Sequence, residues 1–482
     1  MKNILKKIIC IMFILFIILL LYVLLFRTNS NYILKREEVN INKILVIAID
    51  LLFAFLFVKL INNNNVSNKK YYYVISVFQI LLFIIQIIIL FSIKFNTGWD
   101  VELVKNTVDT FIKNGSLMNN EYLSIYPNNI LLVGILSLIT KLPIIGKCYM
   151  TTLLFNTILV NLSILFISLS IKNYHSNKLG IIIYMFVIPL IAFNPWFIVP
   201  YSDVYALFFI SIINYIYSRH NKNNRDIFLL VFLSIFGYFI KPTIILPLFC
   251  MIINEVINSQ KIISSKNNKR CVSIVLGIIM ALLIKNCFIQ WLNFQSRKDI
   301  YPMTIFHYLA MGQNTSTAGF YNEIDETNSK NNGYKYDIDV FKDRFVSNIG
   351  RPHFNLIINK MVISFGDGSY LWGYYGNFFP KNILEKSNKY NLFQEIYYIN
   401  GKYYNYYLNI INIIWYCLLL FLPFVLLNGI NKNEQYLIMC ILSMTIFLLV
   451  FEPNSRYIYS YSGIFISLSL MGLYKIYDLL KF

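Results

Sequence analysis

Charged residues are scarce in this chain. Asp, Glu, Lys and Arg make up 13% of its 482 residues, whereas soluble proteins commonly carry about 25%. A chain with so few charges cannot cover a large water-facing surface, which excludes an ordinary soluble domain. The hydrophobic share of 57% instead predicts a protein whose outer surface meets lipid.

Cysteine and histidine are also few, and neither forms a ligand pattern. No CxxC pair occurs and the four histidines are scattered, so the sequence offers no zinc-type spacing and no disulfide framework. We expect the cysteines, which lie in or beside apolar runs, to act as small buried hydrophobes. They are Cys10, Cys148, Cys250, Cys271, Cys287, Cys417 and Cys440.

Nucleotide-binding motifs are missing as well. The absence of a Walker sequence and of GxGxxG weighs against ATP-driven transport and against a cytosolic nucleotide-sugar domain. The net charge of +19 comes mostly from short loops between apolar runs, so membrane orientation by the positive-inside rule explains it better than nucleic-acid binding. We therefore predict no nucleic-acid partner. Heavy use of Asn, Ile, Lys and Tyr indicates an AT-rich, bacterial genome.

Long apolar runs recur throughout the sequence. Each is continuous rather than alternating, which favours helices over the short strands of a membrane barrel. We expect an all-α polytopic membrane protein with about twelve spans, since roughly 20 apolar residues cross a bilayer. Two N-terminal spans (8–26 and 44–61) precede a third at 71–93, and three passes from an inner N-terminus place the next loop outside.

The chain divides by the pattern of these runs. Residues 1–70 hold two transmembrane helices, 71–291 a membrane core, 292–403 a polar extracytoplasmic loop, and 404–482 the C-terminal transmembrane helices. Residues 130–146 form an apolar stretch too short for a comfortable span. If this stretch crossed the membrane, basic loops that follow it would lie outside. The positive-inside rule therefore favours a hairpin on the outer side.

The outer loop at 94–129 is the most distinctive stretch. It places Asp100, Glu102, Asp109 and Glu121 in one connection between apolar runs. A carboxylate just beyond a span can meet a lipid-borne substrate, so we expect Asp100 to be catalytic. The alternative is an ordinary solvated acid. The apolar spacing across 101–112 predicts an amphipathic helix on the outer interface.

Four polar features are predicted to share the outer face. They are Asp100, the PYSD sequence ending at Asp203, the Lys241–Pro242 pair that breaks a helical run, and the EPNSR sequence at 452–456. A lone acid after a span is usually a solvated cap, and a lone arginine is usually an interfacial anchor. Their joint appearance at outer helix ends predicts a common site.

These features resemble the GT-C superfamily of integral-membrane glycosyltransferases, within it the group of protein O-mannosyltransferases and aminoarabinose transferases (glycosyltransferase family 39-like). The resemblance is carried by TGWD (97–100), IYPNN (125–129), NPWFIVPYSDVYALF (194–208), GYFIKPTIILPL (237–248) and EPNSRYIYSY (452–461). It covers most of 71–482 and implies a GT-C-like helical bundle. Two extra N-terminal spans and the lack of a second acid beside Asp100 depart from the family pattern.

The resemblance implies transfer of a sugar from a polyprenyl-phosphate donor to an envelope glycan, lipid or protein on the extracytoplasmic face of the cell membrane. Asp100 would be the catalytic base, and Glu102, Tyr126, Asp203, Lys241 and Arg456 would bind substrate. Lys241 and Arg456 suit the lipid phosphate. Asp203 would orient the acceptor or cap its helix. No obligatory cofactor is implied, and a divalent metal ion stays an open alternative. His307 and Asp367 of the outer loop are further candidates for substrate contact.

Two other functions stay open. An envelope polysaccharide polymerase or ligase would also have many spans and a large outer loop, but its working residues are expected within that loop. A lipid-linked sugar flippase would carry charges within its helices; Lys241, Asp50 and Lys59 keep that alternative open.

Overall fold

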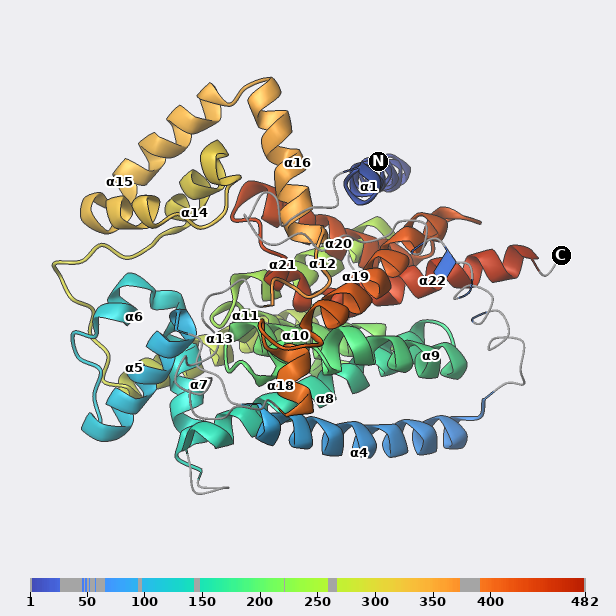
Figure 1. The fold of residues 1–482 in the computed structure, drawn as a ribbon, viewed down its shortest axis with the longest axis horizontal. Helices are drawn as coiled ribbons and strands as arrows, with labels where there is room; N and C mark the ends of the chain where they lie inside the picture. Colours follow the sequence, from blue (N-terminus) through green and yellow to red (C-terminus); the bar gives the residue numbers. More distant parts are fainter. Residues whose placement is uncertain are drawn as a thin grey trace.

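The computed structural model describes residues 2–26, 66–93, 98–142, 148–220, 222–258, 267–372 and 391–480, with a few isolated positions between 46 and 57. Every element in these ranges is helical, apart from one isolated bridge between Met118 and Gln295. The helices form one packed bundle with a smaller group of helices at one end (Figure 1). The predicted all-α fold is confirmed.

The helices up to residue 291 are α1 (Lys2–Phe26), α4 (Asn68–Ser92), α5 (Asp100–Asn114), α6 (Glu121–Ile125), α7 (Ile130–Thr140), α8 (Cys148–Tyr174), α9 (Asn177–Val187), α10 (Ser202–Ser218), α11 (Asn224–Tyr238), α12 (Leu246–Asn258) and α13 (Asn267–Trp291). Those after it are α14 (Ile305–Gly312), α15 (Glu323–Ser347), α16 (Arg351–Phe365), α18 (Leu392–Tyr397), α19 (Tyr404–Phe421), α20 (Lys432–Val450), α21 (Ser455–Tyr459) and α22 (Ser462–Leu480). Short 3-10 or π turns are η1 (Pro127–Asn129), η2 (Ile188–Ala192), η3 (Pro195–Ile198), η4 (Pro242–Ile245), η5 (Thr315–Thr317) and η6 (Leu422–Leu426).

Several helices have the length and composition of membrane spans. Within the described ranges, six helices are long and apolar enough to cross: 2–26, 68–92, 150–174, 269–291, 404–426 and 432–450. The first and third predicted spans coincide with α1 and α4, whereas the second, at 44–61, lies outside the described stretches, as do Asp50 and Lys59. The count of about twelve spans stays a prediction.

The short helix α7 occupies the ambiguous apolar stretch. It has 11 residues, nearly all buried, and packs against α5, α8 and α13. At 1.5 Å per residue it is about 16 Å long, roughly half of a bilayer's hydrocarbon thickness. A helix of this length does not cross a bilayer by itself, and the outer hairpin at 130–146 stays a prediction.

The polar segment after α13 is folded. We call residues 292–372 the outer segment, after the extracytoplasmic position predicted for them; it contains α14, α15 and α16. Figure 1 shows α14 and α15 at the same end of the molecule as α5 and α6, with the C-terminus at the opposite end. The outer segment attaches to the α6 region through backbone contacts, among them Met303 N–H to the Ile125 carbonyl at 2.8 Å.

One cysteine prediction is wrong in part. Cys250, Cys417 and Cys440 are buried, but Cys271 and Cys287 are exposed on α13. That helix packs chiefly against α11 along one side, and its other face is apolar and uncovered by protein. In a bilayer this face meets lipid, so a small apolar residue is accommodated there without burial in protein.

Candidate functional site

Asp100 begins helix α5, which lies at the same end of the bundle as α6, α14 and α15 (Figure 1). Acids in the first turn are stabilised by the helix dipole, and Val101, Val104, Val108 and Phe111 form the buried stripe that fixes the helix against its neighbours. The predicted amphipathic helix is thereby confirmed. The Asp100 carboxylate is half-buried and accepts a hydrogen bond from the Tyr201 hydroxyl at 3.2 Å.

Asp203 is the centre of a buried ion cluster. It lies in the first turn of α10 and is 2% exposed, with its Oδ1 atom ion-paired to Lys241 Nζ and its Oδ2 atom 3.5 Å from Arg456 Nε. Both cations are 6% exposed. Three segments far apart in the sequence, which were predicted to share a site, therefore meet here.

Aromatic rings enclose the Arg456 guanidinium. Its central carbon lies 4.5 Å from the ring centre of Trp99 and 5.5 Å from that of Tyr201. Trp196 and Tyr457 complete the enclosure at 5.8 and 5.5 Å. Rings near a cation in a desolvated place attract it, so the TGWD and NPWFIVPYSD sequences hold the arginine between them. Tyr201 contacts Arg456 with its ring and Asp100 with its hydroxyl.

Local sequence rules explain why these side chains lie at helix ends. Helix α11 ends at Tyr238, and Pro242 begins η4 because proline is accepted only in a first helical turn. Lys241 is thereby left in the extended residue before the turn. Arg456 follows Asn454, whose side chain caps the start of α21 by accepting from the Arg456 N–H at 3.0 Å.

Burial changes the proton affinity of Asp100. Desolvation raises the pKa of this carboxyl, and the nearby Arg456 charge and the Tyr201 hydrogen bond oppose that increase. A carboxylate with a raised pKa is a stronger base near neutral pH. The site therefore has the electrostatic setting of a general base.

Glu452 is a second acid that the site contains. It follows α20, accepts a hydrogen bond from the Tyr457 hydroxyl at 2.9 Å, and has its pKa raised by burial, while Arg456 lowers it. The charge of Asp100 also raises the pKa of Glu452. The two carboxyls are therefore close enough to influence each other.

The other predicted residues lie at the rim. Tyr126 is half-buried and donates its hydroxyl to Glu326 Oε1 of α15 at 2.5 Å. Glu102 is half-buried in the first turn of α5, with its carboxylate beside the Gly98 backbone. Because residues two apart on a helix do not share a face, Glu102 and Asp100 point in different directions.

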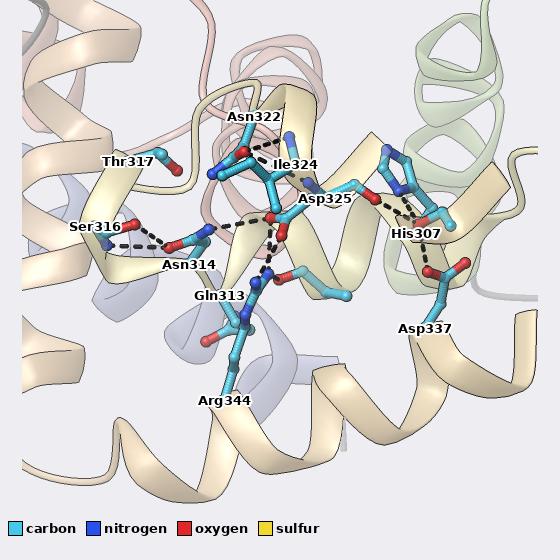
Figure 2. A network of polar contacts seen from close by, with 12 residues as sticks. His307, Gln313, Asn314, Ser316, Thr317, Asn322, Ile324, Asp325, Asp337 and Arg344 are labelled. Carbon is cyan, nitrogen blue, oxygen red and sulfur yellow. Dashed lines mark hydrogen bonds and ion pairs between the residues drawn. The ribbon is translucent and has the colours of Figure 1, made fainter. Parts of the chain in front are cut away.

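The two outer-loop candidates form local hydrogen bonds. His307 is buried and its Nδ1 lies 2.7 Å from Ser329 Oγ (Figure 2). Asp367 is buried in a turn, where its carboxylate accepts from the Ser369 and Leu371 N–H groups at 2.8 and 2.9 Å. The outer segment instead brings Tyr308 and Glu326 near Asp100. Burial is the main cause that raises the pKa of the Tyr308 hydroxyl, and the charges of Asp100 and Glu326 raise it further.

Metal-binding groups do not gather in the parts of the chain that the structure describes. No three side chains of His, Cys, Asp or Glu come together there in a way that could hold an ion. Asp100 has a tyrosine hydroxyl and a guanidinium as its neighbours.

Comparison with known proteins gives a family. A family model described as "Conserved hypothetical integral membrane protein" matches residues 1–475. The chain belongs to this family. Together with the apolar helices, this makes it an integral membrane protein. No curated protein and no solved structure matches the chain.

Three site residues were not singled out from the sequence: Tyr201, Glu326 and Tyr308. Tyr201 could have been found, because it lies two residues before Asp203 in PYSD. Glu326 carries no such signal, since Glu323 and Asp325 precede it in the same polar helix. Its 200-residue separation from Tyr126 makes their contact visible only in the fold.

Proposed function

We propose that this membrane protein is a glycosyltransferase that moves a sugar from a polyprenyl-phosphate donor to an acceptor hydroxyl on the extracytoplasmic face. One observation carries the proposal: Asp100, the Asp203–Lys241–Arg456 cluster and Glu452 converge at the ends of apolar helices. This arrangement offers a base and two cations beside a surface that a lipid tail can approach.

The chemistry assigns one role to each group. The Asp100 carboxylate accepts the proton of the acceptor hydroxyl, and the acceptor oxygen forms a bond to the anomeric carbon. The bond from that carbon to the phosphate oxygen breaks, and its electron pair leaves with the polyprenyl phosphate. Displacement from the opposite side inverts the anomeric carbon.

Lys241 and Arg456 bind the phosphate of the donor. They share one carboxylate partner, Asp203, so the three groups together hold a surplus of one positive charge. Arginine offers paired N–H donors to phosphate oxygens.

The test is transfer by purified protein with a panel of synthetic polyprenyl-phosphate sugars. We expect Asp100→Asn to lower kcat by about 10²- to 10⁴-fold, because it removes the group that accepts the proton. The matched control is Asp109→Asn: nine residues along α5 is two and a half turns, which puts Asp109 on the opposite face. Wild-type turnover by Asp100→Asn, with folding intact, would show that Asp100 is not the base.

A polymerase or ligase of envelope polysaccharide is the second candidate. It is favoured by one observation, the presence of Tyr308 and Glu326 of the outer segment near Asp100. Product length separates the two, because a polymerase extends its product with each turnover whereas a simple transferase adds one sugar. A strain lacking the gene would accumulate polyprenyl-phosphate sugar in either case, whereas loss of a flippase would trap the lipid intermediate on the cytoplasmic face.

A further inference from the structure

Lys241 is nearly enclosed by protein, yet its ammonium group is short of hydrogen-bond acceptors. The side chain is ion-paired with Asp203, and its Nζ atom lies 4.4 Å from the ring centre of Tyr457. An ammonium group offers three N–H donors. Among the residues that the structure describes, Asp203 is the one acceptor for these donors. An aromatic ring therefore faces a cation that is 6% exposed and can still donate hydrogen bonds.

Tyr457 joins this cation to an acid. Its hydroxyl donates to Glu452 Oε2 at 2.9 Å, and its ring centre lies 5.5 Å from the central carbon of the Arg456 guanidinium. One ring thus faces both cations of the cluster. Aromatic rings attract cations in desolvated places, and a hydrogen bond to a carboxylate is among the stronger ones. The bond to Glu452 therefore holds the ring against Lys241.

The backbone on both sides of this hydroxyl bond is fixed. The Tyr457 N–H donates to the Asn454 carbonyl at 3.1 Å. Lys360 donates to the Phe451 carbonyl at 2.7 Å, immediately before Glu452. Because a tyrosine side chain rotates between staggered positions about its own bonds, the ring of Tyr457 can leave Lys241 without a change in the backbone.

Tyr457 lies on the exposed side of the cluster. Asp203 is 2% exposed, whereas Tyr457 and Glu452 are half-buried. Of the two groups that contact the Lys241 ammonium, only Tyr457 thus reaches the protein surface. An anion that takes the place of Asp203 would leave that carboxylate buried without its partner, which is costly. An anion that takes the place of the ring leaves the ion pair intact, so the ring is the contact that gives way.

We propose that Tyr457 is a movable cover of the donor phosphate site: the phosphate displaces its ring from Lys241, and the hydroxyl bond to Glu452 holds the ring in place until then. The inference rests on the proposed function, which assigns the donor phosphate to Lys241 and Arg456. The exchange is favourable because an ammonium group binds a phosphate oxygen more strongly than it is attracted by an uncharged ring. It explains how a lysine that is 6% exposed can serve as a phosphate ligand.

The first test measures opening of the cover without any sugar transfer. Acetylation of Lys241 by a water-soluble N-hydroxysuccinimide ester, read by mass spectrometry on full-length protein in detergent, reports access to its amine. Tyr457→Phe keeps the ring but removes its bond to Glu452. Acetylation of Lys241 should then be about 10-fold faster, the factor expected for the loss of a hydrogen bond to a charged group. Tyr457→Ala removes the ring and should increase the rate further.

Internal controls separate opening of the cover from loosening of the fold. Lys360 is 0% exposed and should stay unreactive in every variant, while Lys342, whose side chain is 67% exposed, reports the activity of the reagent. Tyr201→Phe also removes a hydroxyl bond to an acid and should leave the Lys241 rate unchanged. If Tyr457→Ala does not fold, Tyr457→Phe still decides. Equal Lys241 rates in wild type and Tyr457→Phe, or a parallel rise at Lys360, overturn the inference.

The second test asks whether phosphate moves the ring. A short-chain polyprenyl phosphate should slow acetylation of Lys241 and speed iodination of the Tyr457 ring, whereas the corresponding polyprenol, which lacks the phosphate, should change neither. If the phosphate slows both reactions, or alters neither, the inference is wrong. The expected pair of changes in a protein that transfers no sugar would sustain the inference while removing the proposed function. Sugar transfer by a protein whose ring does not respond would do the reverse.

Discussion

Asp203 neutralises two buried cations at once. Lys241 and Arg456 both contact it, and all three side chains are at most 7% exposed. Removing one partner of a buried ion pair leaves an uncompensated charge, which is more destabilising than removing both partners. The shared carboxylate should therefore matter more for stability than either cation.

We predict that Asp203→Asn lowers the free energy of unfolding by about 3–5 kcal/mol, more than Lys241→Met or Arg456→Met, because each single cation change leaves one ion pair intact. The double variant Asp203→Asn/Lys241→Met should unfold at a higher temperature than Asp203→Asn alone. Apparent Tm in detergent at one scan rate checks the order. A double variant less stable than Asp203→Asn would contradict the shared-partner account.

The same variants separate stability from donor binding. Lys241→Met should raise the apparent KM for the donor and leave kcat nearly unchanged, because loss of uniform binding affects KM. The double variant should recover Tm but not KM. Recovery of both would mean that Lys241 serves only to balance Asp203.

The pH dependence of transfer follows from the direction of the Asp100 shift. The base acts when deprotonated, so kcat/KM falls as pH drops through the pKa of Asp100, which burial raises above that of an ordinary aspartate. We expect the acidic limb of the profile to lie above about pH 3.9. Glu452 also has a raised pKa, and Glu452→Gln tests whether it contributes. If the acidic limb disappears in Glu452→Gln but remains in Asp100→Asn, the base is Glu452 and not Asp100.

At the scale of elements, the end of α20 is held by a buried lysine from α16. Lys360 is 0% exposed and donates to the carbonyls of Leu449 and Phe451 at 2.8 and 2.7 Å. The final carbonyls of a helix lack partners within it, so Lys360 supplies them. Gly312 of α14 lies against the same end, since a Cβ there would be 2.5 Å from the Val450 carbonyl oxygen. These contacts fix the direction in which the chain leaves α20 toward Glu452 and Arg456.

We predict that Lys360→Met destabilises the protein by about 1–3 kcal/mol, the range for leaving buried polar groups unsatisfied, and also lowers kcat by displacing Glu452 and Arg456. Apparent Tm and single-turnover rates measure the two effects. Lys342→Met is the control, because that lysine side chain is 67% exposed. Unchanged turnover at a reduced Tm would limit Lys360 to a structural role.

At the scale of the whole molecule, the decisive property is which ends of the helices face outside. Helix α5, which begins with Asp100, lies at the same end as α14 and α15 of the outer segment, and the C-terminus lies at the other end (Figure 1). Ser316 is exposed in the outer segment. Asn224 is exposed at the start of α11, whereas Lys241 follows the other end of that helix, so we predict that the two positions lie on opposite sides of the membrane. Ser202 and Ser218 are buried and would report packing rather than sidedness.

We predict that a membrane-impermeant maleimide labels Ser316→Cys in intact cells but labels Asn224→Cys only after permeabilisation. The variants are made in a chain whose seven cysteines are replaced, because Cys271 and Cys287 are exposed. Retained sugar transfer shows that the background is folded. The opposite labelling pattern would place the Asp100 site on the cytoplasmic side and remove the proposed donor geometry.

Much of the fold could be predicted because local physics sets it. Continuous apolar runs must satisfy their backbone groups internally, so they become helices. The predicted runs at 8–26 and 71–93 match α1 and α4, and the predicted amphipathic helix at 101–112 matches α5. The Lys241–Pro242 break also appeared where proline dictates. These features depend on neighbours within a few residues.

The contacts of the site were decided by tertiary structure. The sequence indicated that Asp203, Lys241 and Arg456 share the outer face, yet only the fold showed that Asp203 is the partner of both cations. Glu326 reaches Tyr126 only because Gly333 bends α15 and Arg344 returns to hold Asp325. Such contacts join residues up to 200 positions apart, and no local propensity specifies them, because they depend on how whole helices pack.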